Sequence, residues 1–227
     1  MENAKLNLLE EYLLIALDDD KGQFVTSSTH LHYGFAGAIL LELAIRGKIA
    51  IEDDKVKLKD STYEKEMALN KAIDYVKENK DCSVKTCIQH LAKKANELKQ
   101  DTLQRLINKG ILKKEEHKIL WLIPNDKYPT TDLTPESKVR QRLDDVMLHG
   151  AKADAHDVML LSLIDVSDLT KEAFRSKEDY KMVKKKIKEV TKDVQVSSVV
   201  NKSIREIQAA IMLAITTSIV VSTVVSN

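Results

Sequence analysis

The chain has 227 residues, of which 43% are hydrophobic and 31% are charged, and this balance excludes an intrinsically disordered protein. Its 36 basic and 35 acidic side chains leave a net charge of +1, which disfavours a general nucleic-acid binder because neutralising phosphates requires a basic excess. With only six glycines and three prolines, long helices and short connections are expected.

The first quarter of the chain predicts two helices and a hairpin. Apolar residues recur at helical spacing over Leu6–Leu17, and this helix is expected to end in the turn cluster Asp18–Gly22. The range Gly34–Arg46 is apolar on nearly all sides, which predicts a helix inside the protein with Gly47 as its C-terminal cap. Alternating apolar residues over Lys48–Lys59 predict a short β-hairpin.

The middle of the chain predicts three further helices and a second hairpin. The helices are expected at Tyr63–Lys77, from the capping residue Ser83 to Leu91, and at Glu97–Lys109. The range Ile111–Pro124 then has an apolar start, a charged centre and an apolar end. This pattern predicts two apolar strands joined by a charged turn.

The second half of the chain is predicted to be helical. A helix capped by Thr134 is expected to run to His149. Further helices are expected at Asp154–Ile164, Ser167–Phe174 and Lys177–Val190, and Ser203 is expected to cap a final helix. Ala209–Val225 is largely apolar but diluted by serine and threonine, which favours a core helix over a membrane anchor. We therefore predict one mainly α domain over residues 1–227, a bundle of about ten helices with two or three short β-hairpins.

Motifs that carry catalysis or bind metals are absent from the sequence. It contains no glycine-rich phosphate loop, no GxSxG and no HExxH. The pairs His30 and His32, and His149 and His156, lack further ligands at suitable spacing, and Asp18–Asp20 has neither the glycine nor the distant glutamate of a calcium loop. We therefore expect no enzyme activity, no catalytic residue, no metal and no cofactor.

The two cysteines and the N-terminus both point to the cytoplasm. Cys82 and Cys87 are too few for a disulfide framework and wrongly spaced for a zinc site, so reduced, partly buried thiols are expected. The first residues lack the basic and apolar pattern of a secretory signal. A cytoplasmic protein is therefore predicted.

Two stretches are candidate interaction surfaces. Lys177–Lys192 holds seven lysines, which is typical of a solvated helix face, with contact to an anionic membrane or nucleic acid as the alternative. Ile119, Leu120, Trp121, Leu122 and Ile123 are consecutive large apolar residues, so a strand there presents apolar side chains on both faces. Either both faces are buried, or one faces a partner subunit or a lipid interface.

Several segments, in order along nearly the whole chain, are similar to a known family. These segments are Leu8–Leu17 with Asp20–Gly22, Gly37–Ile49, Leu106–Leu112, Arg140–Leu143 and Leu160–Phe174. Together they resemble the Golgi phosphoprotein 3 family, and Gly37–Ile49 is the most specific of them. The resemblance implies a mainly helical domain that binds phosphatidylinositol 4-phosphate at a membrane surface, which in eukaryotic members is the Golgi, where they also act as adaptors for the tails of resident enzymes.

The resemblance also implies site residues. The family's hydrophobic hairpin, which assists membrane insertion and self-association, falls at Ile119–Ile123. The head-group positions fall at Ser27, Ala36, Asn96 and Lys99, and of these only Lys99 keeps a positive charge where the family has basic residues. An arginine fork holds phosphate with two hydrogen bonds, whereas a single lysine supplies a point charge.

Three functions are compatible with these observations. The first is a cytoplasmic, peripherally membrane-associated module that recognises an anionic, phosphoinositide-type lipid, with protein cargo or a homo-oligomer as further partners. The second is a winged-helix-like nucleic-acid regulator, because Ser83–Leu91, Glu97–Lys109 and the hairpin Ile111–Ile123 follow the order of helix, recognition helix and wing; the net charge and the apolar wing disfavour it. The third is a protein-only adaptor that uses the Trp121 hairpin.

Overall fold

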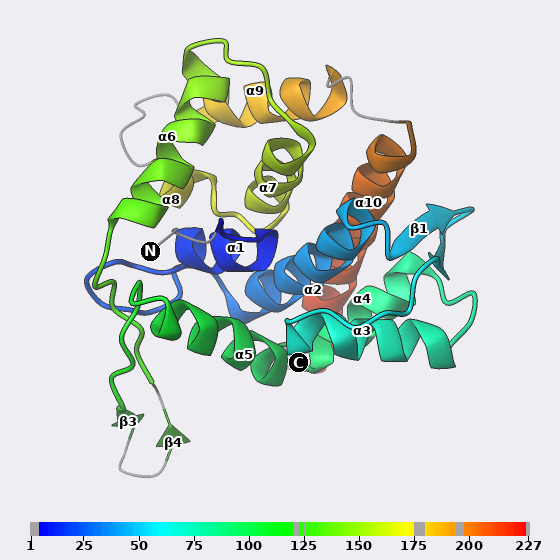
Figure 1. Cartoon of the computed structure of the whole chain (residues 1–227), viewed down its shortest axis with the longest axis horizontal. Coiled ribbons are helices and arrows are strands. Elements are labelled where there is room, and N and C mark those ends of the chain that lie inside the picture. Colours follow the sequence, from blue (N-terminus) through cyan, green and yellow to red (C-terminus); the bar gives the residue numbers. More distant parts are fainter. Residues whose placement is uncertain (1–4, 120–122, 125, 175–179, 194–197, 226–227) are drawn as a thin grey trace.

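The computed structural model of the chain describes residues 5–119, 123–124, 126–174, 180–193 and 198–225, and side chains within parts of the last two helices and the second hairpin fall outside the description. The helices are α1 Leu8–Ala16, α2 Ser28–Ile45, α3 Met67–Glu78, α4 Val84–Lys93, α5 Ala95–Asn108, α6 Thr134–Leu148, α7 Ala155–Val166, α8 Thr170–Ala173, α9 Tyr180–Asp193 and α10 Ser198–Val225. The strands are β1 Ile49–Glu52, β2 Lys55–Leu58, β3 Lys118–Ile119 and β4 Ile123–Pro124. The mainly helical architecture with short hairpins is thus confirmed (Figure 1).

Helix α2 lies at the centre of the bundle. Helices α1, α4, α7 and α10 pack around it, and its apolar residues from Phe35 to Leu43 are buried. The predicted internal helix is confirmed, but it begins at Ser28 rather than Gly34. The extra turns are polar and form because the Ser27 hydroxyl caps the helix by accepting a hydrogen bond from His30 N, at 3.2 Å.

Helix α10 packs one face into the core, as predicted. Ile204, Ile207, Ile211 and Ile215 are buried, and α10 packs against α2, α4 and α7. It begins at Ser198, so the assignment of Ser203 as its N-cap is wrong, and Ser203 is buried inside the helix. The sequence alone does not distinguish a serine that caps a helix from a serine within it. Within the part of the chain that the structure describes, no helix is both long enough and apolar enough to cross a membrane.

The helix boundaries differ from the predictions where polar side chains fix a loop. Helix α3 begins at Met67 instead of Tyr63, because the Asn70 amide bonds both backbone groups of Glu64, at 2.7 and 2.9 Å, and holds Glu64 in the preceding loop. Helix α8 is a single turn, Thr170–Ala173, rather than the longer helix predicted there. The order of the helices along the chain is nevertheless as expected.

The first hairpin is confirmed and the second has a different turn. β1 and β2 pair from Ile49 opposite Leu58 to Glu52 opposite Lys55. In the second hairpin, Ile119 lies opposite Ile123, and further bridges join Glu115 to Lys127 and Leu112 to Thr130.

The charged stretch 113–118 is therefore the incoming strand, and the prediction that it forms the turn is wrong. Its charges pair along and across the strands, as in the ion pair of Lys114 with Asp126 at 2.9 Å, rather than marking a bend. Figure 1 shows β3 and β4 projecting away from the helices. Leu120, Trp121 and Leu122 lie outside the described residues, as do the side chains of Ile119 and Ile123.

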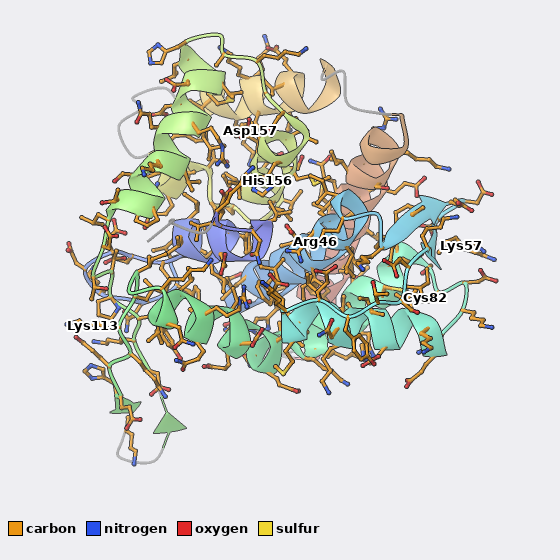
Figure 2. All side chains as sticks on the ribbon, viewed as in Figure 1. Arg46, Lys57, Cys82, Lys113, His156 and Asp157 are labelled. Atoms are coloured by element: carbon orange, nitrogen blue, oxygen red, sulfur yellow. A yellow bond between two sulfur atoms is a disulfide. The ribbon has the colours of Figure 1, made fainter. Side chains whose placement is uncertain are left out.

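A buried ionic network joins α1 to α6 and α7. Glu11 accepts hydrogen bonds from Arg142 Nη2 at 2.7 Å and from His156 Nε2 at 2.9 Å, and Arg142 Nε donates to Asp157 at 2.6 Å. His156 and Asp157 lie beside one another on α7 (Figure 2). Burial alone would raise the pKa of Glu11, but His156 and Arg142 outweigh it and hold that pKa below its usual range.

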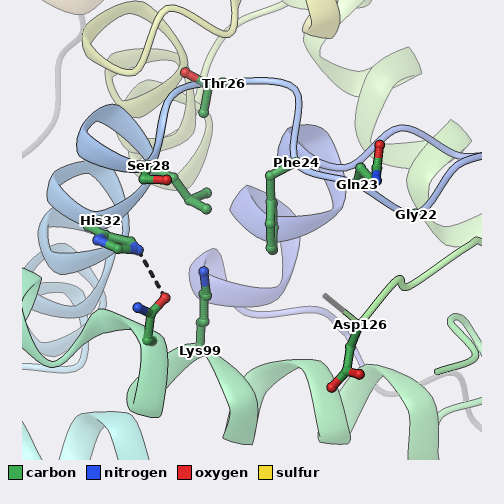
Figure 3. Close-up of a pocket in the computed structure, with 10 residues that line it drawn as sticks. Gly22, Gln23, Phe24, Thr26, Ser28, His32, Lys99 and Asp126 are labelled. Carbon is green, nitrogen blue, oxygen red and sulfur yellow. Dashed lines mark hydrogen bonds between the residues drawn. The ribbon is translucent and has the colours of Figure 1, made fainter. Parts of the chain in front are cut away.

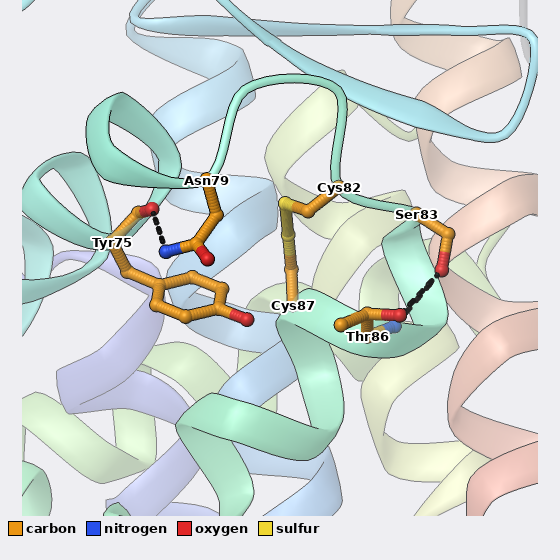
Figure 4. Close-up of a disulfide and its surroundings, with 6 residues drawn as sticks. All are labelled: Tyr75, Asn79, Cys82, Ser83, Thr86 and Cys87. Atoms are coloured by element: carbon orange, nitrogen blue, oxygen red, sulfur yellow. Dashed lines mark hydrogen bonds between the residues drawn. A yellow bond between two sulfur atoms is a disulfide. The ribbon is translucent and has the colours of Figure 1, made fainter.

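The two cysteines are joined by a disulfide, so the expectation of reduced thiols is wrong in this structure (Figure 4). Ser83 caps α4 by accepting from Thr86 N at 3.1 Å, and the first turn of α4 brings Cys87 back toward Cys82. Their Cα atoms are 6.4 Å apart, within reach of a disulfide. The expectation of reduced thiols rested on the number and spacing of the cysteines and did not take account of this local turn.

Candidate functional site

A pocket of about 340 Å³ lies where the loop between α1 and α2, the start of α2, the start of α5 and the second hairpin meet (Figure 3). It is lined by Gly22, Gln23, Phe24, Thr26, Ser28, Leu31, His32, Asn96, Lys99 and Asp126. Most of these side chains are polar, so the pocket is suited to a polar ligand.

The loop between α1 and α2 is fixed by its own turn and by the hairpin. Gly22 N donates to Asp18 O at 2.8 Å and Lys21 N donates to the Asp18 carboxylate at 2.7 Å, which confirms the predicted turn. Gly22 has φ +61°, and a Cβ there would collide with the backbone of Tyr128 and Pro129. Because Tyr128 N also donates to Gly22 O at 2.8 Å, the loop and the hairpin base form one wall of the pocket.

Lys99 is the principal charge in the pocket. It is only 9% exposed, and its Nζ lies 4.8 Å from the centre of the Phe24 ring. Among the residues that the structure describes, none gives Lys99 a carboxylate partner or a hydrogen-bond acceptor. Burial lowers the pKa of Lys99, because the charged ammonium is removed from water without a counter-ion. An anion entering the pocket would supply that counter-ion.

Asn96 and His32 line the pocket beside Lys99 and bond each other. His32 Nε2 lies 3.1 Å from Asn96 Oδ1, so the ring donates to the amide oxygen and the donors of the Asn96 amide nitrogen are not used in this bond. Burial, and then the positive charge of Lys99, lower the pKa of His32, so its ring is neutral at neutral pH. Ser28 begins α2, where unpaired backbone N–H groups and the helix dipole favour an anion.

One carboxylate lines the pocket and opposes anion binding. Asp126 reaches the lining from the outgoing strand of the hairpin. Its charge is paired with Lys114 Nζ at 2.9 Å. The potential in the pocket is therefore set mainly by Lys99 and by the start of α2.

The structure brings together only part of the set that the resemblance implied. Asn96 and Lys99 line the pocket side by side on α5, and Ser27 caps α2 between two lining residues. Ala36 is completely buried inside α2 and does not line the pocket. Phe24 and His32 were missed, because nothing in the sequence shows that the loop folds over Lys99.

The other candidate residues have structural partners. His30 Nδ1 lies 2.7 Å from the Ser27 hydroxyl and His32 bonds Asn96, and both histidines lie in the first turns of α2. No group of three or more metal-ligating side chains gathers in the described ranges. On α9, Val183 and Ile187 face the core and Lys185 is exposed, as expected of a solvated helix face.

The arrangement of α4, α5 and the hairpin does not favour a nucleic-acid reader. Lys99, a residue that such a reader would offer to a groove, is buried in the pocket. Arg105 lies 3.3 Å from Glu66 and 3.6 Å from Glu10, so its charge is already compensated. Gln104, a third polar residue of the predicted recognition helix, is exposed.

The loop wall of the pocket is also held by a carboxyl pair, Asp19 and Glu136. Glu136 is 2% exposed; burial and its contact with Asp19 raise its pKa to about 7, although Arg140 Nη2 lies 2.6 Å away and opposes this. Because this pKa is above the unfolded value of 4.5, the folded state is disfavoured increasingly as the pH rises from about 4.5 to about 7.

We expect Glu136→Gln to remove this part of the pH dependence. Between pH 5 and pH 8 the wild type should lose about 2 kcal/mol more free energy of unfolding than the variant. Urea unfolding at several pH values measures the difference, and Asp19→Asn should reduce the pH dependence by less, because burial is the larger cause of the raised pKa and remains. If the free energy of unfolding of wild type and both variants changed in parallel with pH, the raised pKa of Glu136 would be contradicted.

Comparisons with known proteins cover this site. A sequence model of the family described as Golgi phosphoprotein 3 (GPP34) matches residues 8–207, which include the whole pocket lining. The chain is similar to two fungal proteins named vacuolar protein sorting-associated protein 74. The one from Schizosaccharomyces pombe is 26% identical over 167 residues, which are 64% of this chain and 49% of the relative. The one from Eremothecium gossypii is 23% identical over 164 residues, 63% of this chain and 49% of the relative. The chain thus spans about half the length of the curated relatives it matches.

Proposed function

The chain belongs to the Golgi phosphoprotein 3 family, and from this premise we propose that it is a peripheral membrane-binding module that holds the phosphate of an anionic lipid in the Lys99 pocket. The observation that carries the proposal is the buried ammonium of Lys99, which contacts the Phe24 ring but has no anionic partner among the described residues. A phosphate would remove the free-energy cost of burying this charge.

A phosphoinositide-type head group suits the donors in the pocket. A phosphate monoester carries up to two negative charges and three acceptor oxygens. Lys99 Nζ, the Asn96 amide and the first N–H groups of α2 can each donate to one of those oxygens. A volume of about 340 Å³ is at the lower end of the range for small-ligand sites, which fits one head group rather than a larger molecule.

An adaptor role is part of the proposal. The printed name of the fungal relatives associates them with vacuolar protein sorting, which supports a protein that also binds cargo or a second copy at the membrane. In this proposal the chain acts from the cytoplasmic face of the membrane, by binding and without catalysis.

Sedimentation with vesicles tests the proposal. Phosphatidylcholine vesicles are compared with vesicles that also contain phosphatidylserine or phosphatidylinositol 4-phosphate, at low and at high salt. We expect binding that requires anionic lipid, is strongest with phosphatidylinositol 4-phosphate and weakens with salt, because Lys99 and the start of α2 act electrostatically. Equal binding to all three vesicles would contradict head-group recognition.

Asn96→Asp should weaken head-group binding about tenfold, because it places a carboxylate beside Lys99 and repels phosphate. The substitution preserves size and the acceptor for His32 Nε2, so the fold should be retained. Asn108→Asp is the matched control: it lies exposed at the other end of α5 and accepts from Gln104, at 2.9 Å. Titration of labelled phosphatidylinositol 4-phosphate vesicles measures both, and equal losses would show that the pocket is not the site.

A further inference from the structure

The outward face of α10 carries exposed apolar side chains within the described part of the helix. Met212 is 58% exposed and Leu213 is 49% exposed, while Ile211 and Ile215 on the opposite face are buried. Beyond the exposed Arg205, the exposed positions follow helical spacing and form one uncharged stripe: Ala209, Met212, Leu213 and Thr216. We call these four residues the α10 stripe. Adjacent large apolar side chains left in water are a mark of an interaction surface.

The threonines at this end of α10 turn their polar atoms onto the helix itself. The Thr216 hydroxyl donates to Met212 O at 2.8 Å, and the Thr217 hydroxyl donates to Leu213 O at 3.0 Å. Their hydroxyl protons are thus satisfied within the helix and the methyl groups are left for the surroundings. Such bonding is how threonine is accommodated next to lipid, where water is not at hand as a partner.

Charge is also absent from this end of the sequence. Residues 207–227 contain no Asp, Glu, Lys or Arg. The described part of α10 does not meet the length and apolarity needed to cross a bilayer. A helix with an apolar outer face is suited to lie in the plane of the membrane interface.

The direction of α10 brings the stripe toward the pocket end of α2. Near its start, Lys202 Nζ lies 3.8 Å from Asp53, in the turn after β1, which follows the end of α2. Further along, Ile211 packs at Gly37 in the middle of α2. The two helices are therefore antiparallel, and α10 continues toward Ser28 at the start of α2. Figure 1 shows α10 passing from the β1 side of α2 to the α4 side.

The helix is long enough to reach that end. From Gly37 back to Ser28 the backbone of α2 rises about 14 Å, at roughly 1.5 Å per residue. Helix α10 continues beyond Ile211 to Val225, which at the same rise is about 21 Å. The uncharged end of α10 thus extends to the same end of the bundle as the pocket.

We propose that the α10 stripe lies in the interfacial layer of the membrane whose lipid phosphate the Lys99 pocket holds. This inference rests on the proposed function and adds a second, apolar contact to it. The pocket selects the head group, and Met212 and Leu213 enter between the neighbouring lipids. A bilayer is favoured over a second copy of the chain because the stripe continues toward the lipid pocket and its threonine hydroxyls are satisfied internally.

An environment-sensitive fluorophore on single cysteines tests the placement. Both native cysteines are paired with each other, so an introduced cysteine can be labelled selectively under non-reducing conditions. Met212→Cys carries the probe, and Leu148→Cys is the control: Leu148 is 41% exposed at the end of α6, away from α4 and α5 (Figure 1). With phosphatidylinositol 4-phosphate vesicles, the probe at 212 should shift to shorter wavelength and be quenched by brominated acyl chains, whereas the probe at 148 should not.

Affinity gives a second readout. Leu213→Asp should weaken vesicle binding about tenfold at every lipid composition, because a half-exposed leucine no longer enters the apolar layer and a charge takes its place. Leu148→Asp, the same change at a leucine of similar exposure, should bind as the wild type does. Circular dichroism checks that both variants are folded.

The outcomes separate this inference from the proposed function. If vesicles bind and Lys99→Met weakens that binding, but the probe at 212 does not shift, the α10 inference is overturned and the pocket stands. If the probe at 212 enters lipid while Lys99→Met binds normally, the α10 contact stands and the head-group pocket fails. A probe that shifts without vesicles, in step with a concentration-dependent dimer, overturns the lipid contact in favour of self-association. Wild-type protein that binds no vesicle overturns both.

Discussion

Lys99→Met is expected to weaken binding to phosphatidylinositol 4-phosphate vesicles by about 30- to 150-fold and, at the same time, to make the protein more stable. The loss in affinity corresponds to about 2 to 3 kcal/mol for one charged hydrogen-bonding partner in a desolvated site. The gain in stability arises because methionine fills a similar volume without a buried charge. Removing the charge should raise the free energy of unfolding by roughly 1 kcal/mol, or the melting temperature by about 2 to 4 °C.

The stability gain has a defined pH dependence. The pKa of Lys99 is lowered in the folded state, so its destabilising contribution is complete below the folded pKa and disappears as the pH rises through the unfolded value of 10.5. The difference between variant and wild type should therefore be largest near neutral pH and below.

Calorimetry and vesicle titration on the same preparations measure both effects of Lys99→Met. Lys93→Met, at an exposed lysine at the end of α4, is the control for loss of one positive charge. It should change the affinity by less than about twofold and leave the melting temperature close to that of the wild type. A Lys99→Met protein that melts at a lower temperature would mean that Lys99 serves the fold rather than a ligand.

Glu11→Gln should have the largest effect on stability, lowering the free energy of unfolding by about 3 kcal/mol. The glutamine occupies the same volume, but it leaves Arg142 and His156 without their shared negative charge in the interior. Three helices meet at this carboxylate, so the loss should appear as one cooperative transition at lower denaturant concentration. Urea unfolding followed by circular dichroism measures it.

Acid should reduce the effect of Glu11→Gln. The pKa of Glu11 is lowered in the folded state, so its contribution is present above the unfolded value of 4.5 and is lost as the pH falls through the folded pKa. The curves of wild type and variant should therefore converge in acid. Glu52→Gln removes an exposed carboxylate paired with Lys59 at 2.7 Å, and as a control it should change stability far less than Glu11→Gln. Equal losses for both variants would contradict the role of burial.

The sequence pattern predicts the helices well because burial on one face imposes a helical period on the apolar residues, and burial on all faces gives a long continuous apolar run. It predicts less well where single polar side chains decide the outcome. The Ser27 cap moves the start of α2 upstream, and the Asn70 amide delays the start of α3. Serine and asparagine are common in loops as well as at the starts of helices, so a pattern of apolar residues does not show which role they have.

The second hairpin illustrates a different difficulty. Its charged stretch is typical of a turn, yet Lys114 pairs with Asp126 across the strands and the chain reverses after Ile119. Strand register depends on residues that are distant in sequence, and a short charged strand has no period of its own. The disulfide between Cys82 and Cys87 was missed although the Ser83 cap was predicted, because the cysteines were judged by their number and by zinc spacing rather than by the turn that brings them together.

The pocket could be predicted only in part. The resemblance to a family indicated Lys99 and Asn96, which are neighbours on one helix face. Phe24 reaches Lys99 because Gly22 allows the loop to approach Tyr128, roughly 100 residues away along the chain, and no local pattern carries this information.

The packing of α10 on α2 has a consequence for how the protein is made. Gly37 and Ile211, which pack together, are separated by roughly 170 residues, so α2 leaves the ribosome long before its cover exists. At about 5 to 20 residues per second, synthesis of the intervening chain takes on the order of 10 s. During that interval one of the most apolar segments of the sequence lacks its native contacts with α10. Until α10 is made, α2 is a segment prone to aggregation, and a truncation before α10 would leave the centre of the fold without this cover.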